Sequence, residues 1–158
     1  MSEDHIKFMK RAVELAHQGM SSNYGGPFGA VVVKDGKIIA EGHNEVTSSN
    51  DPTAHAEVVV IRRACEHLGD FQLTDCVIYT SCEPCPMCLG AIYWARPKAV
   101  YFGCNQRDAA AIGFDDQFIY DEIDLDIEKR GIKFIPLGRD EALTVFRKWE
   151  EKEDKMEY

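Results

Sequence analysis

The chain has 158 residues, 45% of them apolar and 28% charged, and these proportions predict a single globular domain over residues 1–158. Its 18 basic and 27 acidic side chains give a formal net charge of −9, which argues against a nucleic-acid-binding surface. No apolar run approaches the roughly 18 residues that a membrane span needs, and residues 1–4 lack the pattern of a signal peptide. We therefore expect a cytoplasmic protein with neither a nucleic-acid partner nor a membrane partner.

The N-terminal part of the chain predicts a helix followed by a hairpin. Apolar side chains recur at helical spacing over residues 8–16, and Gly19 is the expected end of that helix. Residues 30–34 and 37–42 predict two antiparallel strands, because the dipeptide Asp35-Gly36 between them is typical of a tight hairpin turn.

Helices and strands then alternate to the end of the chain. Asp51-Pro52 predicts the start of a helix that would continue to about Leu68, before Gly69. The expected buried face of this helix consists of Val58, Ile61, Cys65 and Leu68. The remaining elements expected are strands over 76–80, 99–103 and 132–136, a helix from Pro86 that Arg96-Pro97 stops, and a helix from Arg139 to about Lys155. This order predicts an α/β fold with a mixed five-stranded sheet between layers of helices.

Two short fragments carry side chains that bind metals. His55 lies in the fragment 53–57, and Cys85 and Cys88 lie in the fragment 81–88. Zinc favours imidazole and thiolate ligands, and two cysteines three residues apart at the start of a helix face the same side. One histidine and two cysteines would hold zinc and leave one position open for water.

Glu57 stands next to the predicted zinc site, in the first turn of its helix. A carboxylate beside a zinc-activated water can take its proton and pass it to a leaving group. Two other interpretations stay open at this point. Cys82 could join Cys85, Cys88 and His55 in a closed structural zinc site without catalysis, or the cysteines could be a redox pair or buried thiols.

The pairing of His55-Ala56-Glu57 with Pro84-Cys85-Pro86-Met87-Cys88 is the signature of zinc deaminases. Together with residues 25–30, Asn44 and Trp94, these fragments resemble the cytidine and deoxycytidylate deaminase superfamily. Gly113-Phe114-Asp115-Asp116 and the terminal Glu157-Tyr158 are similar to its bacterial guanine deaminase branch, and the resemblance extends over nearly the whole chain.

The resemblance implies a three-layer sandwich of the cytidine deaminase type and one zinc ion per subunit. It implies that His55, Cys85 and Cys88 bind the metal, that Glu57 and Asp116 are catalytic, and that Asn44, Phe28, Ala56, Trp94 and Tyr158 bind the substrate. The implied reaction converts guanine to xanthine and ammonia. Members of this branch are dimers, so we expect a homodimer that exchanges a C-terminal segment of about residues 137–158. The alternatives are a tRNA adenosine deaminase and a non-catalytic structural zinc domain.

Overall fold

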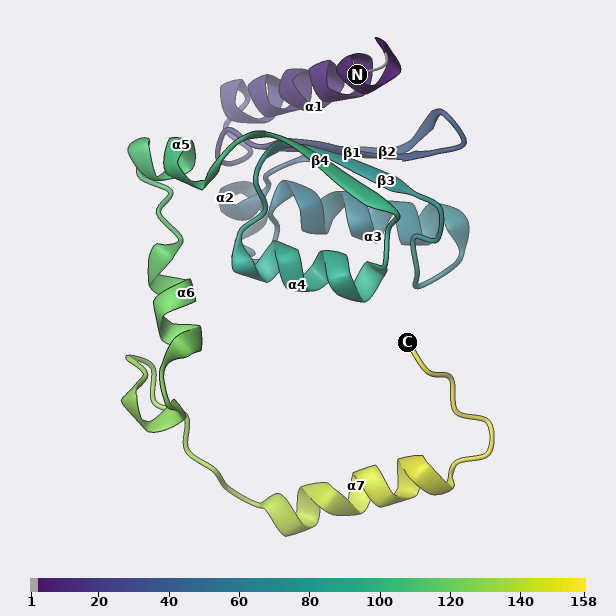
Figure 1. The fold of residues 1–158 in the computed structure, drawn as a ribbon, viewed down its shortest axis with the longest axis vertical. Coiled ribbons are helices and arrows are strands. Elements are labelled where there is room, and N and C mark those ends of the chain that lie inside the picture. Colours follow the sequence, from purple (N-terminus) through teal and green to yellow (C-terminus); the bar gives the residue numbers. More distant parts are fainter. Residues whose placement is uncertain (1–2) are drawn as a thin grey trace. The chain divides into compact units, whose positions relative to one another are not determined.

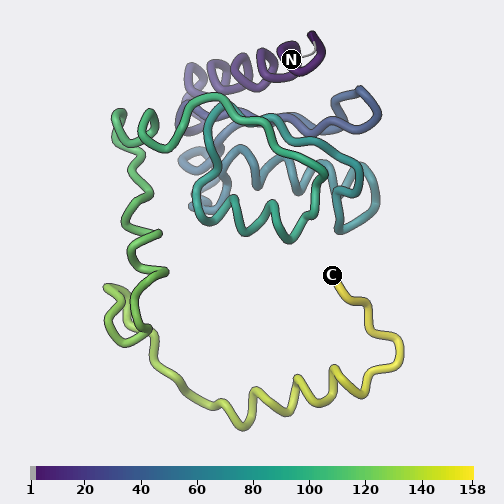
Figure 2. The backbone as a smooth tube through the Cα atoms, viewed as in Figure 1, coloured from purple at the N-terminus to yellow at the C-terminus, as the bar shows by residue number. Residues whose placement is uncertain are grey.

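A computed structural model describes residues 3–158 of the chain (Figures 1 and 2). The chain divides into two compact units, residues 1–116 and residues 117–158. The first unit contains α1 (Glu3–Ser21), β1 (Gly29–Lys34), β2 (Lys37–His43), α2 (Val46–Ser49), α3 (Ala56–Leu68), β3 (Val77–Cys82), α4 (Pro86–Ala95), β4 (Ala99–Cys104) and α5 (Gln106–Ala111). The second unit contains α6 (Gln117–Asp124), the 3-10 helix η1 (Ile127–Lys129) and α7 (Arg139–Glu151). The expectation of one domain over the whole chain stays a prediction.

A four-stranded mixed sheet in the order β2-β1-β3-β4 forms the centre of the first unit. The strand β1 is antiparallel to both β2 and β3, whereas β3 and β4 are parallel and joined through α4. The β1–β2 hairpin is confirmed: Asp35 and Gly36 have φ of 50° and 73°, the left-handed conformation that a tight turn between twisted strands requires.

The sheet is covered by helices on both faces, as Figure 1 shows for the first unit. On one face α1 buries Phe8 and Leu15 against Val31, Val33 and Tyr79. Successive side chains of a strand point to opposite faces of a sheet, so the alternate residues of β1 and β3 pack on the other side.

The second face is the larger apolar core. Here Val60 and Ala64 of α3 pack with Val32 and Ile78 of the sheet and with Ile92 of α4. Complete burial of an aliphatic side chain contributes roughly 1.5–3 kcal/mol, so these contacts hold α3 and α4 firmly beside one another. The N-terminal ends of these two helices carry the predicted metal ligands.

Two local predictions about the helices are wrong. Gly19 does not end α1, which continues to Ser21; a Cβ at Gly19 would lie 2.5 Å from the His43 ring, so glycine is needed for close packing. The second helix starts at Ala56 instead of Asp51, because the Asp51 carboxylate accepts the backbone N–H and the hydroxyl of Thr53 and closes a separate turn. The expected buried face of α3 is confirmed in part. Ile61, Cys65 and Leu68 are half-buried and pack against the core, but the fully buried residues are Ala56, Glu57, Val59, Val60 and Ala64.

The predicted fifth strand over residues 132–136 is wrong: the described residues contain four strands. A strand needs a partner for its backbone hydrogen bonds, and the second unit, which holds this segment, contains only helices and irregular chain. The helix α7 is confirmed but ends at Glu151, earlier than expected. Across residues 3–158, none of the helices has the length and apolar character needed to cross a membrane.

Candidate metal centre

His55 is placed at the N-terminal end of α3 by the turn that precedes it. It is the N-cap residue, with extended φ and ψ of −66° and 154°, and the Ala54 N–H bonds to the Asp51 carbonyl within that turn. Because the chain turns into the helix at this residue, the imidazole and the first-turn carboxylate of Glu57 both lie at the start of the helix. Glu57 is 5% exposed, which is rare for a carboxylate.

Cys85 and Cys88 occupy the equivalent place on α4. Cys85 is the N-cap residue, Pro86 is the first residue of the helix, and Cys88 is completely buried in its first turn. Proline suits this position because it has a helical φ and lacks the N–H that would be unpaired there. The helix start therefore points both thiols to one side, as their spacing predicts.

The tertiary structure brings the three predicted ligands together. Nδ1 of His55 lies 3.5 Å from Sγ of Cys85 and 3.5 Å from Sγ of Cys88, and the three atoms lie within 4.8 Å of one another. A tetrahedral zinc with bonds of about 2.3 Å to sulfur and about 2.05 Å to nitrogen separates such atoms by about 3.5 Å. The side chains are thus spaced as a zinc ion requires, with Nδ1 as the ligand atom of the histidine.

The proton equilibria of these side chains are strongly coupled. Interaction with the Cys88 side chain lowers the pKa of Cys85 to about 4, with a further contribution from His55. The same contact with Cys85, together with burial, raises the pKa of Cys88, and the hydrogen bond with Cys85 raises the pKa of His55. A divalent ion at this position would supply the positive charge that two thiolate ligands need.

Cys82 lies outside this cluster, which argues against the closed Cys₃His interpretation. Of the described residues, only His55, Cys85 and Cys88 form a group with metal-ligand spacing. The Cys82 thiol instead donates to the Asn105 carbonyl at 3.9 Å, and burial raises its pKa to about 12. The fourth zinc position is therefore not filled by this thiol.

Glu57 lies beside the metal ligands and makes two side-chain contacts. The Thr80 hydroxyl donates to its Oε1 at 2.7 Å, and Sγ of Cys88 lies 3.3 Å from its Oε2. Thr80 was not among the site residues predicted from the sequence. A threonine is an ordinary residue for a strand, so only its position in an otherwise apolar segment, Val77-Ile78-Tyr79, offered any signal.

Asn44 is held rigidly in a buried position. It is 6% exposed, and its Oδ1 accepts the backbone N–H groups of Gly26 at 3.3 Å and Val46 at 3.0 Å. Only the oxygen of the amide can accept two N–H groups, so the orientation is set and the NH₂ group is the end that can donate. The backbone N–H of Asn44 also bonds to the carbonyl of Phe28, which joins these two predicted residues directly.

Two further predicted site residues of the first unit are the aromatic Phe28 and the acidic Asp116. Phe28 meets Phe114 edge-to-face, with ring centroids 5.0 Å apart. Asp116 has a buried Oδ1 without a hydrogen-bond partner among the described residues, and its charge contributes to the raised pKa of Cys82. An unpaired buried carboxylate oxygen is costly, which is typical of a group kept for a ligand.

The other predicted substrate-binding residues are less closely placed. Ala56, the first residue of α3, is completely buried between His55 and Glu57. Trp94 lies six residues beyond Cys88 on α4, about 9 Å along the helix, and is 61% exposed. Tyr158 belongs to the second unit and is 70% exposed. Their roles stay predictions.

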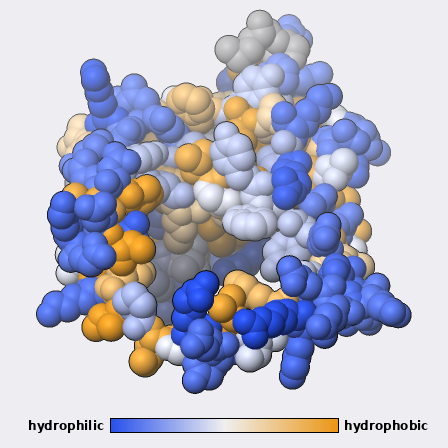
Figure 3. Space-filling view, turned by 60° about the horizontal axis from the view of Figure 1, so that its bottom comes forward, coloured by the Kyte–Doolittle hydropathy of each residue, from blue (hydrophilic) through white to orange (hydrophobic). Residues whose placement is uncertain are grey.

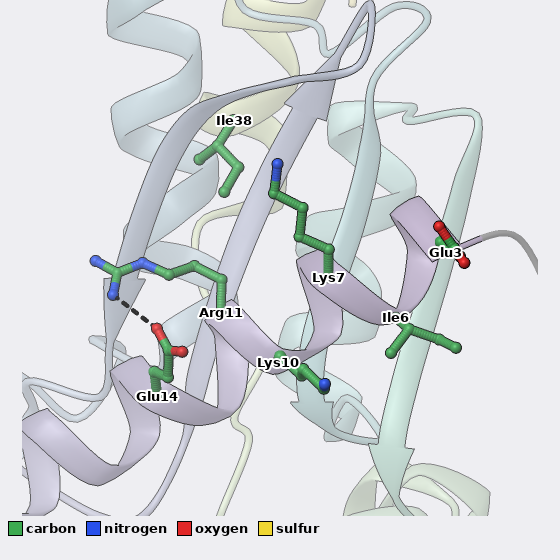
Figure 4. A pocket seen from close by; sticks show the side chains of 7 residues that line it. All are labelled: Glu3, Ile6, Lys7, Lys10, Arg11, Glu14 and Ile38. Carbon is green, nitrogen blue, oxygen red and sulfur yellow. Dashed lines mark hydrogen bonds and ion pairs between the residues drawn. The ribbon is translucent and has the colours of Figure 1, made fainter.

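A hollow elsewhere on the first unit contains none of the predicted site residues. It lies between α1 and β2, has a volume of about 520 Å³, and is shown in Figure 4. Arg11 on its rim is paired with Glu14 at 3.1 Å and with Glu41 at 2.7 Å, so its charge is already satisfied. The full lining is Glu3, Ile6, Lys7, Lys10, Arg11, Glu14 and Ile38.

Comparison with known proteins agrees with this geometry. The chain is 61% identical over 155 residues to a guanine deaminase from Bacillus subtilis, a match that covers 98% of this chain and 99% of that protein. The X-ray structure of guanine deaminase from Bacillus subtilis superposes with a TM-score of 0.95 at 59% identity, over 100% of this chain and 99% of the other.

More distant relatives match with lower identity. A tRNA-specific adenosine deaminase from Agrobacterium fabrum is 45% identical over 86 residues, which are 54% of this chain and 57% of that protein. A guanine deaminase from Nitrosomonas europaea superposes with a TM-score of 0.68 at 28% identity, over 96% of this chain and 86% of that one. The profile described as "Cytidine and deoxycytidylate deaminase zinc-binding region" matches residues 2–104. This chain therefore belongs to the zinc-binding cytidine and deoxycytidylate deaminase family.

Proposed function

We propose that the protein is a zinc-dependent guanine deaminase that hydrolyses guanine to xanthine and ammonia. The observation that carries this function is the zinc-spaced cluster of His55, Cys85 and Cys88 with the buried Glu57 beside it. The 61% identity to a guanine deaminase over 98% of the chain supplies the substrate. The reaction belongs to purine catabolism.

His55, Cys85 and Cys88 hold the metal, which, when bound, lowers the pKa of a water molecule toward neutrality. Glu57 accepts one proton of the attacking water as the water oxygen adds to the ring carbon bearing the exocyclic amine, and delivers this proton to the ring nitrogen. Glu57 then takes the proton of the hydroxyl on the tetrahedral carbon and delivers it to the amine. The carbon–nitrogen bond breaks, the hydroxyl oxygen becomes the carbonyl oxygen of xanthine, and ammonia leaves.

Asp116 is proposed to recognise the guanine edge and to help protonate the departing amine. Guanine presents N–H donors on this edge, which a carboxylate accepts, whereas adenine presents a ring acceptor, which a carboxylate repels. The buried Oδ1 of Asp116, which lacks a protein partner, supports this role.

The amide NH₂ of Asn44 and the backbone of Ala56 are proposed to hydrogen-bond other polar groups of the purine. Phe28 and Trp94 are proposed to pack around the ring. The rigid anchoring of Asn44 by two backbone N–H groups supports its part, because a preset donor loses little entropy on binding.

We also propose a homodimer in which the segment of about residues 137–158 is exchanged, so that the partner subunit's Tyr158 covers the site. Apolar side chains of α7 support this proposal, since Val145 and Phe146 are 63% and 70% exposed and need a surface to pack on. Figure 3 shows hydrophobic residues among hydrophilic ones on one face of the molecule. A cytoplasmic location is proposed as well, because the two cysteine ligands bind zinc only as reduced thiolates.

The test is turnover by the purified zinc-loaded protein, with guanine, adenine, cytosine and guanosine offered in parallel. We expect guanine to disappear with equimolar ammonia and the ultraviolet spectrum of xanthine. A zinc-loaded protein that turns over none of these bases would refute the proposal. Guanosine and s-triazine amines in the same assay define how narrow the substrate range is.

The competing function is tRNA adenosine deamination, which uses the same zinc signature. The relative from Agrobacterium fabrum with that name matches only 54% of this chain, whereas the guanine deaminase match includes the C-terminal part. The net charge of −9 also disfavours a phosphate backbone as partner. Tight, salt-sensitive binding of tRNA in a gel-shift titration would favour the competitor.

A further inference from the structure

Thr80 is a fully buried polar side chain in the middle of the sheet. It is 0% exposed and lies on the internal strand β3, in register with Ala30 of β1 and Phe102 of β4. A hydroxyl in such apolar surroundings is unfavourable unless it finds a hydrogen-bond partner. The partner of Thr80 therefore shows why this position is polar.

The hydroxyl of Thr80 has two acceptors within reach and one proton to donate. Oε1 of Glu57 lies at 2.7 Å, and the carbonyl oxygen of Cys82 lies at 3.2 Å. The carboxylate oxygen is charged and closer, so it takes the proton, and hydrogen bonds to charged acceptors are about twice as strong as neutral ones. Thr80 is thus committed to one oxygen of Glu57.

The second oxygen of Glu57 is in a different situation. Its present neighbour is Sγ of Cys88 at 3.3 Å, which contacts it as a thiol. Cysteine binds zinc as a thiolate, which has no S–H to donate. In the zinc-loaded protein Cys88 can no longer donate to Glu57. Among the described residues, Thr80 is then the remaining side-chain hydrogen-bond donor to Glu57, and it donates to Oε1 alone.

We propose that Thr80 is a positioning residue that gives the two oxygens of the Glu57 carboxylate different roles. Its hydroxyl anchors Oε1, and Oε2 is thereby the oxygen that takes the water proton and delivers it to the purine. This inference rests on the proposed deamination, because the proton path has meaning only for that reaction. It adds a residue outside the zinc signature to the machinery.

The central experiment compares Thr80→Val with Thr80→Ser. Valine matches threonine in shape and fills the same place in the strand but lacks the hydroxyl, whereas serine keeps it. For Thr80→Val we expect a kcat for guanine lower by about 10–100-fold, a loss typical of groups that orient a metal site. KM, zinc content and xanthine affinity by calorimetry should stay within about twofold, since Thr80 is expected to touch neither metal nor substrate. Thr80→Ser should restore kcat to within about threefold of the parent protein.

A neighbouring hydroxyl on the same strand supplies the control. Ser81 follows Thr80 on the strand, so its side chain points to the opposite face, and its hydroxyl accepts the Gly29 N–H at 3.0 Å; Ser81→Ala should therefore leave kcat nearly unchanged. If Thr80→Val does not fold, Thr80→Ala takes its place, because a smaller side chain avoids any steric conflict. A hydroxyl-free variant with kcat within threefold of the parent, or a serine variant as slow as the valine variant, would overturn the inference.

Crystal structures of the zinc-loaded variants test the positioning without any substrate. The Glu57 carboxylate should rotate in Thr80→Val and keep its place in Thr80→Ser, and an unmoved carboxylate in both would also overturn the inference. Failure of the proposed function has a different signature. The unmutated protein would then leave guanine intact while its carboxylate still responded to the loss of the Thr80 hydroxyl.

Discussion

Replacing Glu57 with glutamine separates the chemistry of this side chain from its structural contacts. The amide has nearly the shape of the carboxylate, so its oxygen can still accept the Thr80 hydroxyl, which lies 2.7 Å from Oε1. Its NH₂ group would replace Oε2, 3.3 Å from Sγ of Cys88, and could donate to the thiolate of the zinc-loaded protein. The fold and the metal should therefore survive the change.

The amide cannot take a proton from water, and that loss sets the size of the effect. General acid–base catalysis contributes about 10²–10⁴-fold, so kcat for guanine should fall by that factor, equivalent to about 3–5 kcal/mol in the barrier. Zinc should stay bound, because Glu57 is not one of the three residues with metal-ligand spacing.

Three measurements on Glu57→Gln check this reasoning: kcat by ultraviolet absorbance, bound zinc by atomic absorption, and the urea midpoint of unfolding. Loss of zinc would mean that Glu57 is needed to assemble the site, and a kcat within tenfold of the parent would mean that another group moves the proton. Either result would refute the assignment of Glu57 as proton carrier. In a purely structural zinc domain, the parent protein itself would be inactive.

Three further changes test other parts of the site and fold. Asp116→Asn should lower kcat by about 10–100-fold with a change in unfolding free energy below about 0.5 kcal/mol, because Oδ1 has no protein partner to lose; full activity by the same assay would remove Asp116 from the mechanism. Cys85→Ser should release zinc and lower the melting temperature in calorimetry, and a variant that kept its zinc would show that Cys85 is not a ligand. Arg11→Met should cost about 0.5–1 kcal/mol at pH 7, since this partly exposed guanidinium lowers the pKa of Glu41 from the ordinary 4.5 through its hydrogen bond. A carboxyl group whose pKa is lowered in the folded protein stabilises the fold at pH values above its ordinary pKa, and this stabilisation is lost as the pH falls through the folded-state pKa. The free energy of urea unfolding between pH 3 and 7 should therefore depend less on pH in this variant. An unchanged pH dependence would contradict the role of Arg11.

The metal centre was largely predictable from the sequence by itself. His55, Cys85 and Cys88 each lie at or within one turn of a helix start, so local chain geometry already aims their side chains. The spacing of Cys85 and Cys88 belongs to one helical turn, and proline between them marks where the helix begins. The hairpin around Asp35-Gly36 was predictable for the same reason, because both turn residues determine their own backbone conformation.

Features that depend on a partner distant in the sequence were decided only by the tertiary structure. The predicted strand over residues 132–136 fails because no other strand lies in its unit to pair with it. Glycine is needed at position 19 because the His43 ring packs closely against it, and not because the helix ends there. The most deeply buried residues of α3, such as Val60 and Ala64, were not among the expected ones, because the packing of the helix on the sheet selects which residues are fully covered.

The contact between Thr80 and Glu57 shows the same limit within the site itself. The two residues are 23 positions apart on different elements, and neither sequence fragment predicts that their side chains form a hydrogen bond. The identity of the metal ligands follows from residue type and local spacing, and both can be read from the sequence. The contact between Thr80 and Glu57, by contrast, depends on how α3 packs on the sheet. That packing is determined only when the whole core forms.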